Sequence, residues 1–224
     1  VQTTILFFSI PIAVSLVEPT MHEENKLDRS FSAIMGVVRF AIVDHAKLRW
    51  LIIYSSAMGV ATLSMAWFSQ PFFKEVGVPL VYFGILWAGL NFSAGLTSFN
   101  AYKFDNKKNN YNMLIFLSLA MIISFILLGF NNSLFGLIFI FIIYLLRGIV
   151  TPILRNEINI NTTSNKRATV LSVRSFIIRI SFAICAPILG YIAENHSLSN
   201  SFYVLAVVVG LFSLLASFRL SKLD

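Results

Sequence analysis

Three arginines lie inside long apolar segments of this sequence, where a membrane helix seldom carries charge. They are Arg147, in the segment 134–154, and Arg174 and Arg179, in the segment 168–193. An arginine at the centre of a bilayer costs about 2.5–3.5 kcal/mol on insertion scales, so each must face protein, a water-filled cavity or the lipid headgroups. Arg174 lies nearer the end of its segment, so we expect it to reach the headgroups by snorkelling more easily than Arg179.

The two deeper arginines could bind an anion. A guanidinium group presents a planar fork of donors that matches a carboxylate or phosphate group. We therefore predict that Arg147 and Arg179 project into one central cavity and favour a small-molecule substrate with negative charge or strong acceptor groups. The alternative is that both bond backbone carbonyls and brace their helices.

Small and polar residues recur at helical spacing in four of the apolar segments, which predicts helix faces that line the same cavity. The predicted cavity residues are Arg147, Arg179, Asn91, Thr62, Ser175, Trp87, Thr151 and Gln70. Small residues in such stripes also serve helix packing, and an amide such as Asn91 can equally bond a neighbouring helix.

Residues for catalysis or metal binding do not cluster in the sequence. The histidines and the lone cysteine lie far apart, at His22, His45, His196 and Cys185. We therefore predict no metal site, no cofactor and no disulfide framework. Asp105, Glu157 and Glu194 fall in different loops, so no pair of acids can converge on a substrate. We predict a protein that is not an enzyme. The alternatives are a membrane-embedded enzyme that acts on lipid phosphates, and a channel or structural membrane subunit.

The composition is that of a membrane protein. Hydrophobic residues make up 57% of the 224 residues and charged residues 12%, whereas globular domains carry about 25% charged residues. The net charge of +7 does not indicate a nucleic-acid partner, because the basic residues lie in short loops between apolar segments.

The apolar segments predict an all-α integral membrane protein, because each is close to the roughly 20 residues that cross a bilayer. Six spans are expected at 50–69, 81–102, 111–130, 134–154, 168–193 and 202–218. They form a six-helix domain at 49–219, followed by a tail at 220–224. Residues 1–17 are expected to be the end of a further transmembrane helix. Residues 18–48 are expected to be a cytoplasmic linker with an amphipathic helix, since apolar residues recur at helical spacing from Phe31 to Ile42.

Loop charge predicts the orientation of these spans. Most of the basic residues fall on one side, at Lys26, Arg29, Arg39, Lys47, Arg49, Lys103, Lys107, Lys108, Arg155, Lys166, Arg167, Arg219 and Lys222. Only Lys74 falls in a loop on the other side. By the positive-inside rule the basic side is cytoplasmic, and with it the C-terminus. We expect a multi-pass protein of the cytoplasmic membrane of a bacterium.

The six expected spans differ in polarity. The third (111–130) and the sixth (202–218) contain no charge and little polarity beyond serine. We expect these two to be peripheral and to face lipid, so that leucine at Ser118 or Ser213 should leave transport nearly intact. The other four are expected to line the cavity.

The stretch 144–190 resembles helices ten and eleven of the major facilitator superfamily. The resemblance is carried by Arg147-Gly148, Pro152, the run Arg-Ala-Thr-Val-Leu-Ser at 167–172, Pro187 and Gly190. It implies a transporter of two six-helix halves that moves a solute by alternating access. The present spans would be helices seven to twelve, of which nine and twelve stand outside the cavity. The chain opens at Val1 inside an apolar run, so we expect an N-terminal half to precede it.

Overall fold

The described part of the chain consists of helices joined by short turns. The computed structural model describes residues 11, 15, 31–103 and 110–223, which contain helices and turns but no strand. Six helices within these residues are long and apolar enough to cross a membrane, as predicted. The expected helix end at 1–17, apart from positions 11 and 15, and the first part of the expected linker, 18–30, lie outside the described residues.

The six long helices are preceded by a short one. It is α2 (Phe31–Arg39), which continues into a π-helical turn, η2 (Phe40–Asp44). The long helices are α3 (Ala46–Glu75), α4 (Phe83–Phe99), α5 (Asn110–Phe130), α6 (Gly136–Ile160), α7 (Arg167–Asn195) and α8 (Leu198–Leu220). Single 3₁₀ turns, η3 (Leu80–Tyr82), η4 (Ala101–Lys103) and η5 (Ser164–Lys166), flank α4 and precede α7.

Helices α3 and α6 each run six residues beyond the ends expected at 69 and 154. Apolar length limits only the part of a helix that can lie in hydrocarbon, whereas the backbone hydrogen bonds continue through polar residues. Pro71 lies inside the extra turn of α3. Phe72 and Phe73 directly after it are buried, so packing holds this turn in place although proline removes one hydrogen bond.

Two of the connections use side-chain caps. The Nδ1 atom of His45 accepts a hydrogen bond from the Leu48 N–H at the start of α3 (3.3 Å). The hydroxyl of Ser197 accepts one from the Asn200 N–H at the start of α8 (3.2 Å). Both satisfy donors that the first turn of a helix leaves free. After α3 the chain turns at Gly77, whose φ of +77° favours glycine.

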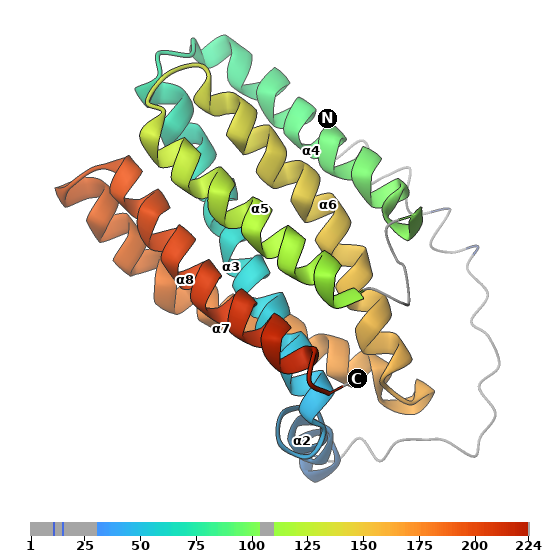
Figure 1. The fold of residues 1–224 in the computed structure, drawn as a ribbon. Coiled ribbons are helices and arrows are strands. Elements are labelled where there is room, and N and C mark those ends of the chain that lie inside the picture. Colours follow the sequence, from blue (N-terminus) through green and yellow to red (C-terminus); the bar gives the residue numbers. More distant parts are fainter. Residues whose placement is uncertain (1–10, 12–14, 16–30, 104–109, 224) are drawn as a thin grey trace.

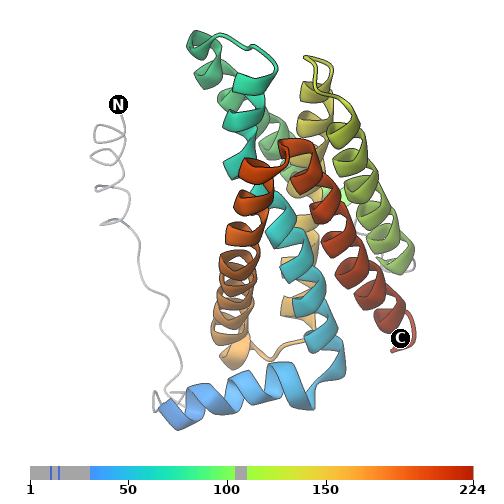
Figure 2. The ribbon, with the colours of Figure 1, turned by 90° about the vertical axis from the view of Figure 1, so that its left-hand side faces the viewer.

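Consecutive long helices run in opposite directions, so the bundle has two ends (Figure 1). The basic end, as we call it, holds Arg39, Lys47, Arg49, Lys103, Arg155, Lys166, Arg167, Arg219 and Lys222. Figure 2 shows α2 lying across this end, nearly at right angles to the long helices. The short α2 and the C-terminus are therefore at the same end of the bundle.

Two groups of helices pack most closely. One joins α5 to α8 and α8 to α3, and the other joins α4 to α6. In the first group the Tyr54 hydroxyl of α3 donates to the carbonyl oxygen of Leu114 on α5 (2.8 Å) and lies 3.2 Å from the hydroxyl of Ser118. In the second, the Thr97 hydroxyl of α4 lies 3.0 Å from the Leu145 carbonyl oxygen of α6. A Cβ atom on Gly148 would collide with Ala94 and Thr97, so only glycine lets α4 and α6 approach this closely.

Within the described bundle α5 and α8, the third and sixth expected spans, are more buried than α4 and α7. In α5 and α8, 44% and 50% of the apolar window is buried, against 6% for α4 and for α7. Ser118 and Ser213 are fully buried. The Ser118 hydroxyl is satisfied by the carbonyl oxygen of Leu114 in the preceding turn (2.9 Å). A helix without charged residues can therefore pack inside the bundle, because small hydroxyl side chains allow close approach.

Candidate functional site: an arginine-lined cavity

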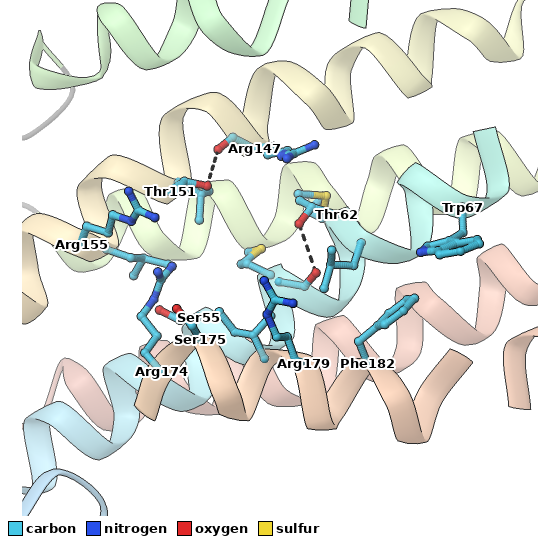
Figure 3. A pocket seen from close by; sticks show the side chains of 17 residues that line it. Ser55, Thr62, Trp67, Arg147, Thr151, Arg155, Arg174, Ser175, Arg179 and Phe182 are labelled. Carbon is cyan, nitrogen blue, oxygen red and sulfur yellow. Dashed lines mark hydrogen bonds between the residues drawn. The ribbon is translucent and has the colours of Figure 1, made fainter. Parts of the chain in front are cut away.

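A cavity of about 500 Å³ lies between α3, α6 and α7 (Figure 3). Its walls are Ser55, Met58, Gly59, Thr62, Leu63 and Trp67 of α3, Met121 of α5, Arg147, Val150, Thr151, Leu154 and Arg155 of α6, and Arg174, Ser175, Ile178, Arg179 and Phe182 of α7. Among the described helices, α4 and α8 contribute no residue to these walls. The cavity is of the size that small-molecule sites have in proteins.

Helix α7 is held against α3 on one side of the cavity. The Ser56 hydroxyl of α3 donates to the Ser181 hydroxyl of α7 (2.7 Å). Ile178 lies directly over Gly59, where a Cβ atom would collide with it. Helix α6 packs much less closely on α7 than α3 does. The cavity is therefore a groove with α3 as its floor and α6 and α7 as its walls.

Four arginines line this groove, and no acidic residue in the described part of the chain does. Arg147 and Arg155 lie eight residues apart on α6, which places them on one face of the helix. Arg174 and Arg179 come from α7, on the opposite wall (Figure 3). None of the four forms an ion pair with another described residue. Within these residues the groove therefore carries uncompensated positive charge.

Arg174 does not reach out to the headgroups as expected. Its side chain is only 6% exposed, and its Nε atom is buried without a hydrogen-bond partner among the described residues. Figure 3 shows its guanidinium group turned toward that of Arg155. Helix α7 presents Arg174 to α6, so that the side chain is buried between helices. The direction of the side chain therefore follows from helix packing and not from the expected depth of the residue in a bilayer.

Arg147, one of the two predicted anion ligands, lies against an aromatic pair. Its guanidinium carbon is 5.6 Å from the centre of the Tyr144 ring, close enough for a cation–π interaction. The Trp87 ring of α4 meets the same tyrosine edge-on, with 6.1 Å between ring centres. Trp87 itself does not line the groove, so it supports Arg147 through Tyr144.

Two other predicted residues do not line the groove either. Asn91 is exposed on α4, and its amide donates to the carbonyl oxygen of Trp87 in its own helix (2.9 Å). Gln70 is exposed near the far end of α3. The structure therefore separates Asn91, Trp87 and Gln70 from the other five predicted residues, all of which line the groove.

The predicted hydroxyl residues are at the groove, each bonded within its own helix. Thr62 donates to the Gly59 carbonyl oxygen (3.1 Å), and Thr151 to that of Arg147 (2.9 Å). Ser175 likewise donates to the Leu171 carbonyl oxygen (2.9 Å). Because their protons are used, these hydroxyls can offer a ligand mainly acceptor oxygens.

Twelve of the 17 residues that line the groove were not among the predicted ones, and those with polar or aromatic side chains are Ser55, Trp67, Arg155, Arg174 and Phe182. Ser55 is 1% exposed, and its hydroxyl has no partner among the described residues. The spacing of Ser55 from Gly59 and Thr62, and of Arg155 from Arg147 and Thr151, was a usable signal, since each set repeats every three or four residues. The aromatic residues gave no such signal.

Ser175 and Arg179 are exposed on α7, in the middle of an apolar helix. Among the described residues, no group of three His, Cys, Asp or Glu side chains could hold a metal ion.

In comparisons with protein-family models, curated proteins and solved structures, nothing matches this chain.

Proposed function

We propose that this chain is the carboxyl-terminal half of a secondary transporter of the major facilitator type, which moves a small solute by alternating access. The observation that carries the proposal is the groove of about 500 Å³ with four arginines, inside a bundle of helices long enough to cross a membrane. Polar groups at such depth are costly and occur where a substrate path or a water-filled cavity needs them.

The exposed polar residues of α7 support a second half. Arg179 and Ser175 are exposed on a helix of which only 6% of the apolar window is buried. Lipid cannot cover an arginine at this position without a large penalty. A further helix bundle placed over the open side of the groove would cover both residues and enclose the solute.

The side chains that line the groove favour a carrier over an enzyme. Neither a carboxylate nor a histidine or cysteine of the described residues is among them, so the serine and threonine hydroxyls of the groove have no general base of the usual kinds beside them. In the proposed protein the basic end faces the cytoplasm of a bacterium, in accord with the positive-inside rule. The proposed solute is a small anion. The proposed site of the coupling ion is in the other half of the protein.

Counterflow with the full-length protein in liposomes tests the proposal. A panel of labelled anionic, neutral and cationic solutes would be offered to vesicles loaded with the same unlabelled solute. Saturable accumulation of an anion is the expected result. Ohmic current without counterflow would indicate a channel, and chemical conversion of the solute an enzyme, and either would overturn the proposal.

A matched pair of substitutions links transport to the groove. Thr62→Trp places a large ring in the groove, because Thr62 lies on its floor, and should abolish counterflow. Val207→Trp adds the same ring on α8 at a side chain that is 60% exposed, and should leave counterflow unchanged. Normal counterflow by both variants would show that the solute does not pass through this groove.

A further inference from the structure

We propose that the groove binds an organic dianion: a phosphate monoester or similar doubly charged group between Arg155 and Arg174, with an aromatic or apolar body directed toward Trp67 and Phe182. This inference deepens the proposed function by naming the class of solute, and it rests on that function for the transport of the bound solute. The binding itself is independent of transport.

The first observation is the pair of arginines near the basic end of the groove. Arg155 and Arg174 come from different helices, and their guanidinium groups are turned toward each other in the same groove (Figure 3). Arg174 is 6% exposed, and its Nε atom has no partner among the described residues. Two like charges brought together without an acid repel each other and lose solvation. A bound group with two negative charges would remove both costs.

Other arginines at the same end of the bundle look different. Arg167 donates from Nε to the carbonyl oxygens of Asn159 (3.1 Å) and Thr162 (3.2 Å). Arg49 donates to those of Ile42 (3.4 Å) and Val43 (3.3 Å). These are the contacts of an arginine that braces the backbone. Arg174 makes no such contact in the described part of the chain, which argues against a bracing role.

A buried hydroxyl lines the same groove as the pair. Ser55 is 1% exposed, lines the groove and has no hydrogen-bond partner within residues 31–103 and 110–223. Arg174 and Ser175 of α7 line the same groove (Figure 3). A phosphate monoester has three terminal oxygens and carries nearly two charges at pH 7. It could accept from both guanidinium forks and from Ser55, whereas a carboxylate has two oxygens and a single charge.

The opposite end of the groove has another character. Trp67 and Phe182 face each other there, from α3 and α7 (Figure 3). Trp67 is 71% exposed and therefore has free ring surface. Arg147 and Arg179 lie between the two ends, on opposite walls. A ligand with a charged head and an apolar body would match this sequence of charges and rings along the groove.

Binding to the full-length protein in neutral detergent micelles tests the proposal. The probes are phenyl phosphate, inorganic phosphate and benzoate, titrated by calorimetry. Phenyl phosphate should bind at least about tenfold more tightly than benzoate, because each charged hydrogen bond that is lost costs about that factor. Equal affinity for phenyl phosphate and benzoate would overturn the assignment of a dianion site.

Substitutions locate the head of the ligand. Arg155→Gln should weaken both phenyl phosphate and inorganic phosphate about tenfold or more, and since Arg155 is exposed the variant should fold. Arg174→Gln should do the same, with its folding checked by gel filtration. Arg219→Gln removes a charge at the same end of the bundle but outside the groove, and should change affinity less than about twofold. Wild-type affinity in Arg155→Gln would overturn the proposal.

A third substitution locates the body of the ligand. Trp67→Ala should weaken the binding of dodecyl phosphate and leave inorganic phosphate unchanged, because Trp67 lies 12 residues beyond Ser55 on α3, about 18 Å, and only a long apolar body reaches its ring. If both probes weaken equally, or neither does, the assigned orientation is wrong.

Two further measurements separate the possible sources and functions. A lipid phosphate is distinguished from a free phosphate ester by competition: phosphatidic acid that displaces phenyl phosphate at lower concentration than any soluble ester identifies the lipid as the source of the same group. Binding of phenyl phosphate without counterflow would overturn the proposed transport but not the proposed dianion site. Counterflow of an uncharged solute that phenyl phosphate does not inhibit would overturn the proposed dianion site but not the proposed transport.

Discussion

The hydroxyl of Ser56 on α3 donates a hydrogen bond of 2.7 Å to the hydroxyl of Ser181 on α7. It joins a well-buried helix to one whose apolar window is only 6% buried. Beside it, Ile178 of α7 fits over Gly59 of α3. The side of the groove formed by α3 and α7 is thus fixed by a polar contact and a close apolar one, whereas α6 packs much less closely on α7.

We predict that Ser56→Ala and Ser181→Ala each lower the thermal midpoint of the protein in detergent. The coupling energy in a double-mutant cycle should be about 0.6 kcal/mol, the mean for hydrogen bonds between membrane helices. Ser93→Ala is the control, because its hydroxyl donates within its own helix, to the Leu90 carbonyl oxygen. Additive effects of the two serines would mean that the bond does not hold α7.

We predict that Gly148→Ala disrupts the contact between α4 and α6. Its Cβ atom would collide with the Ala94 carbonyl oxygen and the Thr97 hydroxyl, and overpacking of this kind costs about 1–3 kcal/mol. Gly95→Ala on α4 is the matched control, since nothing in the described part of the chain lies within 4 Å of its added atom. The measurement is the yield of folded protein after gel filtration. A normal yield of Gly148→Ala would contradict the close approach of these helices.

We predict that Ser213→Leu destabilises the bundle. Ser213 is fully buried on α8, so the larger side chain must displace its neighbours, at about 1–3 kcal/mol. Val207→Leu, at a side chain that is 60% exposed on the same helix, should leave the thermal midpoint unchanged. This reverses the expectation from the sequence. A thermal midpoint of Ser213→Leu equal to that of the wild type would show that α8 lies at the periphery of the bundle.

We predict a stepwise loss of transport at Arg179. Lysine keeps the charge but loses the fork, and glutamine loses both. Counterflow at low solute concentration should fall in that order, by about tenfold or more for Arg179→Gln, while expression and membrane insertion stay at the level of the wild type. Arg219→Gln serves as the control outside the groove. Normal transport by Arg179→Gln would leave this arginine as scaffold.

We predict that the two ends of the bundle lie on opposite sides of the membrane. Single cysteines would be introduced at His196, between α7 and α8, and at Ser221, after α8, in a Cys185→Ala background; both positions are exposed. In intact cells a membrane-impermeant maleimide should label the first and not the second. Labelling of both from one side would refute the topology.

The sequence alone was sufficient to predict the six long helices. Runs of about 20 apolar residues leave the backbone no other way to satisfy its hydrogen bonds in lipid, so composition and length decide the secondary structure. The helical spacing of small and polar residues was likewise enough to place Thr62, Thr151 and Ser175 each on the polar face of its own helix, because a helix puts residues three or four apart on one face. Each of them lines the groove.

Only the tertiary structure decided which helices meet and which arginines stand together. Periodicity gives the faces of one helix but not the rotation of that helix against its neighbours. Asn91 and Trp87 carried as strong a polar signal as Thr62, yet α4 packs on α6 in a way that keeps them out of the groove. Arg155 and Arg174 lie 19 residues apart, on consecutive helices, and face each other because α6 and α7 end and begin at the same end of the bundle and turn these residues toward one another. Which charged side chains stand in the groove therefore depends on how the helices pack against one another, and not on the polarity of any single helix.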